Sequence, residues 1–252
     1  PGRGHTATAV GPDTVVVYGG QADDDAGQAT LGDLSTFHLT RREWRRSLNG
    51  DSVPRTWHSA SFLVDQKLLV VFGGERSVGG VLEPLDDIMV LDTSIMLWYP
   101  PEISGKAPPP RAGHSAAVLG SDVMVFGGTR GRKWQNGVWA LDTERWRWRV
   151  VPTTGRPPAP RSYHSATAVG GAMMVVLGGN NCEASLRLEE RESFGQVAVL
   201  RTSAAAGIGG GGSGVGRSSP SPSWEWFYPE VMGTAPAPRT GHSAVLLADG
   251  RT

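Results

Sequence analysis

The sequence predicts an all-β fold assembled from repeated antiparallel sheets of four strands, and three recurring patterns carry this prediction. An arginine followed closely by His, then Ser or Thr, then Ala occurs five times, in 3–7, 55–60, 111–116, 161–166 and 239–244. The copies are spaced by about 50 residues, with a longer last step, which is typical of propellers and solenoids. An apolar run ending in two glycines and a tryptophan-bearing segment recur in phase with the arginine motif.

The third repeat gives the expected order of strands most clearly. After the prolines at 108–110, small residues at 114–119 predict a strand in a crowded place, and the apolar run 123–126 predicts a strand buried on both faces. A loop at 129–137 then precedes a third strand, 138–141, which the turn-favouring Asp142 and Thr143 end. The alternating segment 146–150 is a half-exposed fourth strand.

The same elements recur in the other repeats. The paired glycines, which permit positive φ and close backbone approach, are Gly19-Gly20, Gly73-Gly74, Gly127-Gly128 and Gly178-Gly179. The expected fourth-strand tryptophans are Trp44, Trp98, Trp148 (or Trp146) and Trp226 (or Trp224).

This ensemble resembles the kelch repeat over nearly the whole chain, in four complete units. The resemblance implies blades of a β-propeller, with these glycines and tryptophans as the structural motif. We therefore expect blades at about 1–50, 51–106, 107–156 and 157–234, and the start of a fifth at 235–252.

Two features complicate the array. The fifth unit has a candidate first strand, 242–247, without a following apolar strand, so we expect an incomplete propeller from a longer protein; alternatively, this strand completes the first blade and closes a small ring. Residues 204–223 are a Gly/Ser/Pro-rich insertion with the composition of a flexible linker. Its Ser219 and Ser221, each followed by proline, are candidate phosphorylation sites as an alternative to a plain linker.

Composition excludes several classes of function. The net charge is zero, which is unlike a nucleic-acid-binding domain, and no apolar run approaches the length of a transmembrane helix. The single cysteine, Cys182, permits no internal disulfide and favours a reducing compartment, so we expect a cytoplasmic protein. We expect no membrane insertion and no nucleic-acid partner.

No catalytic constellation is evident. The glycines at 207–212 match a dinucleotide-binding pattern, but no helix follows them. The five repeated histidines could converge on a metal, but one per repeat without clustered carboxylates indicates a structural role, and the matching arginines are expected to bridge adjacent blades. Copper-oxidase propellers resemble the chain in fold but need a cysteine cross-linked to a tyrosine, which Cys182 does not offer. We expect no enzyme, no metal and no cofactor; a ligand- or metal-binding propeller enzyme is the alternative.

A four-stranded meander places the loops between strands two and three on the same face as the proline-rich connections between blades. These loops are 21–32, 75–86, 129–137 and 180–195, and the connections are 47–54, 101–110, 152–160 and 229–238. Long loops on a rigid scaffold are where binding residues concentrate. The sequence therefore predicts a protein-interaction scaffold or adaptor with candidate partner-binding residues Asp23, Asp24, Asp25, Arg76, Arg130, Arg132, Lys133 and Trp134.

Overall fold

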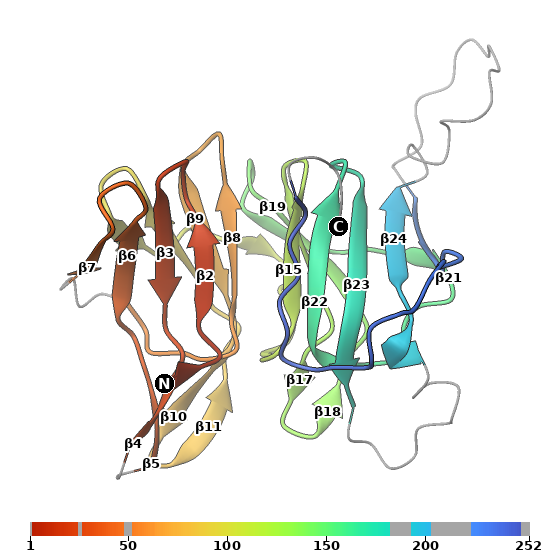
Figure 1. The fold of residues 1–252 in the computed structure, drawn as a ribbon, viewed down its shortest axis with the longest axis horizontal. Helices are drawn as coiled ribbons and strands as arrows, with labels where there is room; N and C mark the ends of the chain where they lie inside the picture. The colour runs from red at the N-terminus through yellow and green to blue at the C-terminus, as the bar shows by residue number, and fades with distance from the viewer. Residues whose placement is uncertain (1, 25–26, 48–51, 182–192, 203–222, 248–252) are drawn as a thin grey trace.

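The regular secondary structure of the computed structural model is almost entirely β-strand (Figure 1). It describes residues 2–24, 27–47, 52–181, 193–202 and 223–247. Cys182, Asp25, Ser219, Ser221 and nearly all of the expected insertion lie outside the described residues.

Each of the four repeats forms one antiparallel sheet of four strands, so the predicted fold class is confirmed. The first sheet contains β2 (Thr6–Ala9), β3 (Thr14–Tyr18), β6 (Leu34–His38) and β7 (Glu43–Ser47). The second contains β8 (Ser59–Leu63), β9 (Leu68–Phe72), β12 (Ile88–Asp92) and β13 (Leu97–Tyr99). The third contains β15 (Ser115–Leu119), β16 (Asp122–Phe126), β19 (Val138–Asp142) and β20 (Arg147–Val150). The fourth contains β22 (Ser162–Val169), β23 (Met173–Asn180), β24 (Ala198–Thr202) and β25 (Trp224–Phe227).

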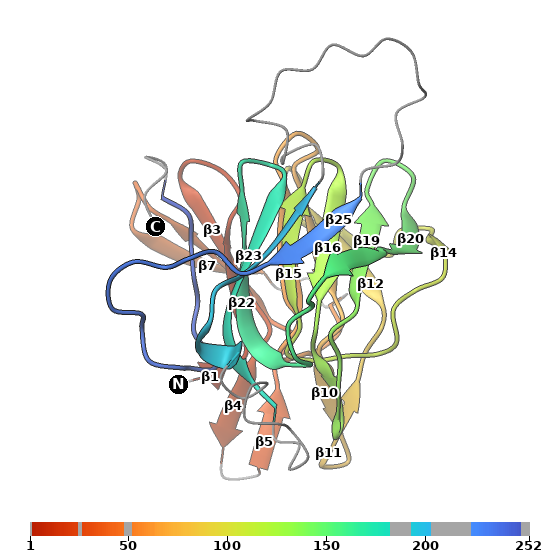
Figure 2. The same ribbon diagram turned by 90° about the vertical axis from the view of Figure 1, so that its right-hand side faces the viewer.

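The first strands of successive sheets, β2, β8, β15 and β22, are neighbours and form the inner edge of the array. Each sheet extends outward from there to its fourth strand, as the blades of a propeller do. Figures 1 and 2 show the tight turns at one end of the sheets and longer hairpins projecting from the other end.

The apolar core is divided into three clusters, one between each pair of adjacent sheets. Each cluster pairs an aromatic residue at the end of a second strand with the fourth-strand tryptophan of the next sheet. The ring centroids are 4.8 Å apart for Tyr18–Trp98, 5.0 Å for Phe72–Trp148 and 4.9 Å for Phe126–Trp226. This contact, repeated at every interface, explains why an aromatic or apolar residue precedes each glycine pair.

The glycine pair is required because the second strand ends against two backbones. Gly127 has φ +67°, and a Cβ there would come within 2.7 Å of the carbonyl oxygen of Arg161 in the next sheet. Gly128 has φ +92°, and its Cβ would lie 2.9 Å from the Cβ of His114 in its own sheet. The other three pairs have positive φ at both glycines as well.

The segments expected as loops between strands two and three contain β-hairpins in three of the four repeats. They are β4 (Gln21–Asp24) with β5 (Gly27–Thr30), β10 (Glu75–Val78) with β11 (Val81–Pro84), and β17 (Thr129–Arg130) with β18 (Lys133–Trp134). In the fourth repeat the described part is a short 3₁₀ turn, η1 (Ser193–Gly195).

Two of the proline-rich connections, expected to be loops, also contain short strands. β14 (Ser104–Gly105) and β21 (Thr153–Gly155) pair in parallel with β20 and β25, the outer strands of the third and fourth sheets. The connections thus tie each of these sheets to the one before it.

The segment after Arg239 differs from the expected fifth inner strand. It runs beside the fourth sheet, where Gly241 donates to the carbonyl of Tyr163, but 242–247 form no regular strand. In the other repeats the first strand pairs with a second strand of its own sheet, and the described residues hold no such strand for this segment. The first sheet has four strands of its own, so these contacts do not show the segment closing the array.

The first arginine motif is out of register with the others. Arg3 belongs to β1 (Gly2–Arg3), where it pairs with Gln21, while Thr56 and Ala112 bridge to Glu75 and Thr129 at the equivalent place. Arg3 is therefore the counterpart of the residue after each buried arginine, and it is exposed. Only one residue separates Arg3 from the following histidine, which accounts for the offset.

Candidate functional site

The buried arginines of the repeat join neighbouring sheets. Arg55, Arg111 and Arg161 are each fully buried, and their guanidinium groups donate to the first glycine carbonyl of their own sheet at 2.8–3.0 Å. Their main-chain carbonyls accept from the second glycine of the preceding sheet, as in Gly74 N to Arg111 O at 2.9 Å.

The acceptors of the remaining guanidinium nitrogens differ between repeats. Arg55 forms a bidentate pair with Asp87 at 2.7 and 3.0 Å, whereas Arg111 donates to Gln135 Oε1 at 2.8 Å. Burial lowers the pKa of Arg111 and Arg161 to about 10, so both stay charged at neutral pH. These cations are used by the fold and are not available to a ligand.

The repeated histidines form a ladder of hydrogen bonds around the inner edge. From the second repeat on, each Nε2 contacts the hydroxyl that follows the histidine of the preceding sheet: Thr6 to His58 at 2.9 Å, Ser59 to His114 at 2.9 Å, Ser115 to His164 at 2.7 Å and Ser165 to His242 at 3.0 Å; His5, in the first repeat, is exposed. The His-Ser/Thr dipeptide is therefore one donor–acceptor unit that links each sheet to both neighbours.

These histidines are held neutral by their surroundings. Burial, reinforced by Arg55, lowers the pKa of His58 to about 3. Burial likewise places the pKa of His114 and of His164 well below the usual value, with the adjacent arginines adding to the effect. Because each Nε2 is already bonded across a sheet interface, the repeat does not present these rings as a metal ring or as general bases.

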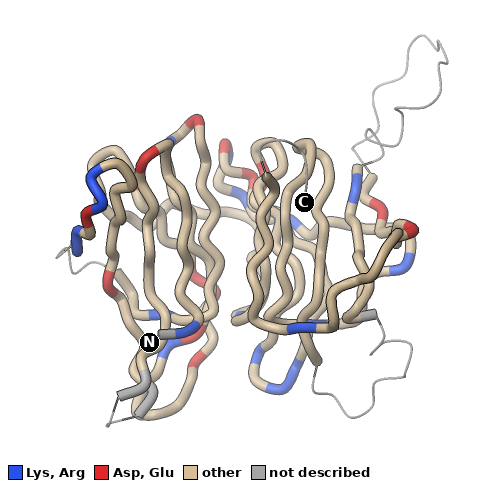
Figure 3. The backbone as a smooth tube through the Cα atoms, viewed as in Figure 1, with Lys and Arg blue, Asp and Glu red and all other residues tan. Residues whose placement is uncertain are grey.

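The β17–β18 hairpin carries a group of exposed cations. Arg130, Arg132 and Lys133 are exposed on the β17–β18 hairpin, and no described carboxylate forms an ion pair with them. Figure 3 shows these cations gathered below the third sheet. The neighbouring β10–β11 hairpin exposes three apolar side chains, Val78, Val81 and Leu82, beside the charged Arg76 and Glu83.

Two of the other candidate contact residues, Trp134 and Arg76, make side-chain contacts of their own. Trp134 is half-buried, and its indole N–H donates to Ser162 Oγ at 3.1 Å, so it anchors the basic hairpin to the fourth sheet. Arg76 lies opposite Glu83 in the β10–β11 pair, with 3.6 Å between the charged groups. Asp23 and Asp24 lie on β4 in the first hairpin.

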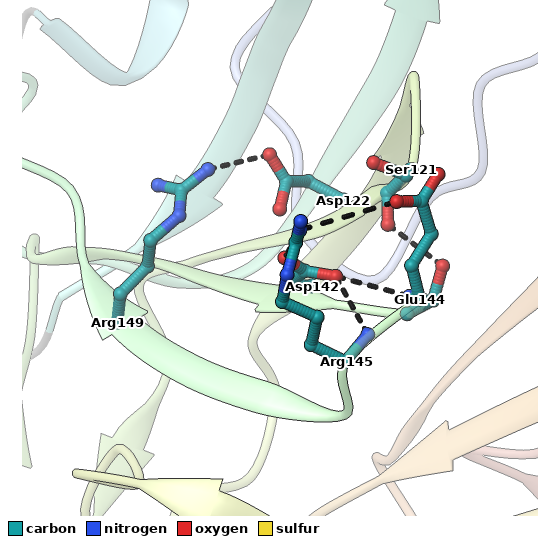
Figure 4. A network of polar contacts seen from close by, with 7 residues as sticks. Ser121, Asp122, Asp142, Glu144, Arg145 and Arg149 are labelled. Atoms are coloured by element: carbon teal, nitrogen blue, oxygen red, sulfur yellow. Dashed lines mark hydrogen bonds and ion pairs between the residues drawn. The ribbon is translucent and has the colours of Figure 1, made fainter. Parts of the chain in front are cut away.

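Opposite the hairpins, the turns carry a compact charged network (Figure 4). Asp142 accepts from the main chain of Glu144 and Arg145 at 3.0 and 2.9 Å and pairs with the Arg145 guanidinium at 3.0 Å. Arg149 pairs with Asp122 at 2.5 Å, although burial raises the pKa of that carboxyl. The exposed Arg145 contributes little beyond fixing its turn, whereas the Arg149 pair links the outer strand β20 to β16.

Two cavities flank the inner edge of the array. One, of about 530 Å³, lies among the inner segments of all five repeats and is lined by residues that include Arg3, Trp57, Tyr163 and the repeated histidines. The other, of about 520 Å³, is lined by Leu177, Phe194, Tyr228 and the connection leading to Arg239. Leu177 occupies the position that Tyr18, Phe72 and Phe126 hold in the other sheets.

Within the described ranges, no three His, Cys, Asp or Glu side chains are grouped so that they could hold a metal ion. The same ranges contain no helix with the length and apolarity to cross a membrane.

The chain is similar to proteins with kelch motifs. It is 34% identical over 127 residues to acyl-CoA-binding domain-containing protein 4 of Arabidopsis thaliana, which is 50% of this chain and 18% of that protein. It is 33% identical over 127 residues to dynein regulatory complex subunit 7 of Chlamydomonas reinhardtii, 50% of this chain and 10% of that protein. It is 32% identical over 124 residues to the Rab9 effector protein with kelch motifs of Bos taurus, 48% of this chain and 31% of that protein.

These alignments span less than a third of each relative's length. The profile of a protein family, described as the KLHDC2/KLHL20/DRC7 Kelch-repeats domain, matches residues 4–205. That range contains all four glycine pairs and the four histidines that the structure places along the inner strands β2, β8, β15 and β22. The chain therefore belongs to this family of kelch-repeat domains.

Proposed function

We propose that this chain is a non-catalytic protein-interaction domain that binds its partner through the face carrying the hairpins. The observation that carries the proposal is the position of β4–β5, β10–β11 and β17–β18, which project from one end of the rigid sheets. Among the described side chains, Val78, Val81, Arg130, Arg132 and Lys133 are exposed at the tips of β10–β11 and β17–β18, outside the core clusters between the sheets, so they are available to a partner at little cost in stability.

The polar residues of the repeat support a scaffold rather than a catalyst. The histidines and buried arginines contribute to the interfaces between sheets, while the hairpin face carries exposed apolar groups and charges of both signs. Two relatives are named as an effector of Rab9 and as a subunit of a dynein regulatory complex, names that imply action together with other proteins.

The basic hairpin is the part of this face most easily tested. Replacing Arg130, Arg132 and Lys133 by serine removes three exposed cations while Trp134 keeps the hairpin anchored. We expect the triple variant to keep the wild-type melting temperature and to lose proteins that co-purify with the wild type, most strongly at low ionic strength.

The matched control removes three exposed cations elsewhere, by replacing Arg41, Arg45 and Arg147 with serine on the outer strands and the opposite turns. This control should retain the partners. An identical set of co-purifying proteins for both variants would contradict the proposal.

A further inference from the structure

The three hairpins that project from one end of the sheets follow one another in the order acidic, apolar and basic. They belong to successive repeats, whose inner strands are neighbours. The first hairpin, β4–β5, has Asp23 and Asp24 in its last two cross-strand pairs. The third, β17–β18, contains no carboxylate and exposes Arg130, Arg132 and Lys133 (Figure 3). The two end hairpins therefore carry opposite charge.

The middle hairpin, β10–β11, is apolar at its tip. Val78 lies opposite Val81 in the last cross-strand pair, and Leu82 belongs to the pair before it, on the other face of the hairpin. All three side chains are exposed, and none belongs to a described core cluster between the sheets. Further from the tip, Arg76 and Glu83 lie opposite each other with 3.6 Å between the charged groups, so their charges offset each other.

Hydrogen bonds hold the hairpins in fixed positions. Ser77 N donates to Thr30 Oγ1 at 3.2 Å, which joins the middle hairpin to the acidic one. The Trp134 indole N–H donates to Ser162 Oγ at 3.1 Å, which joins the basic hairpin to the fourth sheet. A binding surface formed by these hairpins is preorganised, and this reduces the entropy lost on association.

The hairpins also differ in length. All three begin at the residue after a glycine pair, but β4 and β10 run for four residues and β17 for two. At about 3.3 Å per residue, the acidic and apolar hairpins project roughly 7 Å further from the sheets than the basic one. Figure 1 shows β4–β5 and β10–β11 extending beyond the end of β17–β18.

This order of charge and length is complementary to itself. When two copies face each other across a twofold axis through their middle hairpins, the acidic hairpin of each copy meets the basic hairpin of the other. A long hairpin then meets a short one at both ends of the contact. The two middle hairpins are both long, so they overlap side by side by roughly two residues of each strand. The overlapping part is the tip that carries Val78, Val81 and Leu82.

The charges of the chain favour such a contact. The formal net charge is zero, so two copies have no net charge repulsion between them. The described carboxylates form no ion pair with Arg130, Arg132 or Lys133, so these cations can pair with another chain without breaking an internal ion pair.

We infer that the hairpin face binds a second copy of this chain. In the resulting dimer, β17–β18 of each copy contacts β4–β5 of the other, and the two apolar β10–β11 tips pack together. This inference rests on the proposed function and names the partner of the same face. Because three hairpins form a small contact, we expect a reversible dimer with a dissociation constant on the order of 10 µM.

Charge reversal, followed by sedimentation velocity over a concentration series, tests the geometry of the dimer. The R130E/R132E/K133E variant makes both end hairpins negative, and the D23K/D24K variant makes both positive. Each variant alone should dimerise at least about tenfold more weakly than the wild type, because like charges meet at both ends. An equimolar mixture of the two variants should form a heterodimer, because opposite charges then meet again. The variant that combines all five changes should recover the homodimer for the same reason.

Two further variants test whether the effect is specific. The R41E/R45E/R147E variant reverses three exposed cations on the outer strands and the opposite turns, and it should dimerise as the wild type does. The V81S/L82S variant removes two exposed apolar groups of the middle tip, so it should weaken the dimer while leaving its dependence on salt unchanged. Equal weakening by R41E/R45E/R147E and R130E/R132E/K133E would overturn the inference.

A measurement on the wild type covers the case in which D23K/D24K does not fold. A carbodiimide joins an amine directly to a carboxylate that lies against it. In a mixture of isotopically labelled and unlabelled chains, it should link Lys133 of one copy to Asp23 or Asp24 of another. Dimers whose cross-links never join these residues would contradict the proposed contact.

The remaining outcomes separate this inference from the proposed function. A wild type that stays monomeric at a few hundred micromolar would overturn the dimer. So would a dimer that the charge reversals leave unchanged, because it would use another surface. If other proteins still co-purify with a monomeric wild type and are lost from R130S/R132S/K133S, the hairpin face is retained as a binding site and only the self-association is rejected.

Discussion

The histidine ladder makes the stability of the domain depend on pH within a narrow window. Acidification from about pH 7.5 to about pH 5.5 is the perturbation. His58, His114 and His164 are buried and neutral in the folded chain, and their pKa values lie well below the ordinary value of about 6.5. In the unfolded chain each ring takes up a proton as the pH falls through about 6.5, whereas in the folded chain it does not.

The unfolded state therefore binds more protons in this window, so the free energy of unfolding falls as the pH falls. Stability is fully present above the unfolded pKa and decreases by about 1.4 kcal/mol per pH unit for each histidine below it. Integrated over the whole window from pH 7.5 to pH 5.5, three histidines lose about 4 kcal/mol by this account. That is a large part of the roughly 5–15 kcal/mol that stabilises a typical domain.

Urea unfolding followed by tryptophan fluorescence at several pH values measures this loss. The midpoint should fall steadily below pH 6.5 while the slope m stays constant. The carboxyl groups of Glu75 and Asp122, whose pKa values are raised by burial, act in the opposite direction wherever they titrate. A midpoint independent of pH between 7.5 and 5.5 would refute the reasoning.

The H114Q variant is the control for the assignment. Glutamine can still place an amide nitrogen toward Ser59 Oγ, but it cannot be protonated, so the pH dependence should fall by about a third whatever the stability at neutral pH. An unchanged dependence would mean that His114 does not contribute.

Two further predictions concern the packing of the sheets. G128A should destabilise the third sheet by more than about 2 kcal/mol, because the added Cβ would lie 2.9 Å from the Cβ of His114. The control G131A, also at positive φ but with open space around it, should cost only about 1 kcal/mol. Equal losses in urea unfolding would reject the steric argument. W148A should lower the free energy of unfolding by about 3–5 kcal/mol, because the side chain is 2% exposed. W44A, at a residue that is 60% exposed, should lower it by less than about 1 kcal/mol. A reversed order of unfolding midpoints would contradict the core assignment.

The sequence alone was sufficient to predict the four sheets, because the residues that recur in each repeat are those that make the contacts between neighbouring sheets. Every glycine pair meets the backbone of the next repeat, and each repeated histidine from His58 on is bonded to the hydroxyl that follows the preceding one. A contact made at each interface requires the same residue type at the same place in each repeat. Periodicity therefore revealed both the fold and the structural role of the histidines.

Features that occur once, or in only some repeats, were harder to predict. The parallel strands β14 and β21 arise in segments rich in proline, which predicts loops. The sequence did contain a signal for these short strands, because Gly105 and Gly155 both stand six residues before a buried arginine. In the structure both glycines have positive φ and lie against a tryptophan of the outer strand. Similarly, residues 242–247 have no regular secondary structure because no second strand among the described residues pairs with them, and the local sequence alone does not show this.

The sequence predicted which face carries the candidate site, but not how the individual side chains are placed on it. The basic hairpin is exposed as expected, yet Trp134, expected as a contact residue, is engaged by Ser162. The contact between the Trp57 and Tyr163 rings was not predicted, because both residues stand at positions that vary between repeats. Both have positive φ where other repeats have glycine, and only the structure reveals this conformation and the glycines opposite the rings.

Comparing the repeats separates residues that every interface between sheets requires from residues that serve one repeat alone. Where the repeats agree, an interface between sheets accounts for the residue, as for the glycine pairs. Where one repeat departs from the others, the residue makes a contact that the other repeats lack, as Trp57 does with the Tyr163 ring at 4.7 Å between centroids, on a backbone that Gly113 adopts without strain. The departures, rather than the repeated motif, are therefore the positions at which a contact between repeats is made only once. W57G tests this directly, because glycine makes the same backbone hydrogen bonds elsewhere, so a change in the urea unfolding midpoint reports the balance between the lost ring contact and the relieved backbone strain.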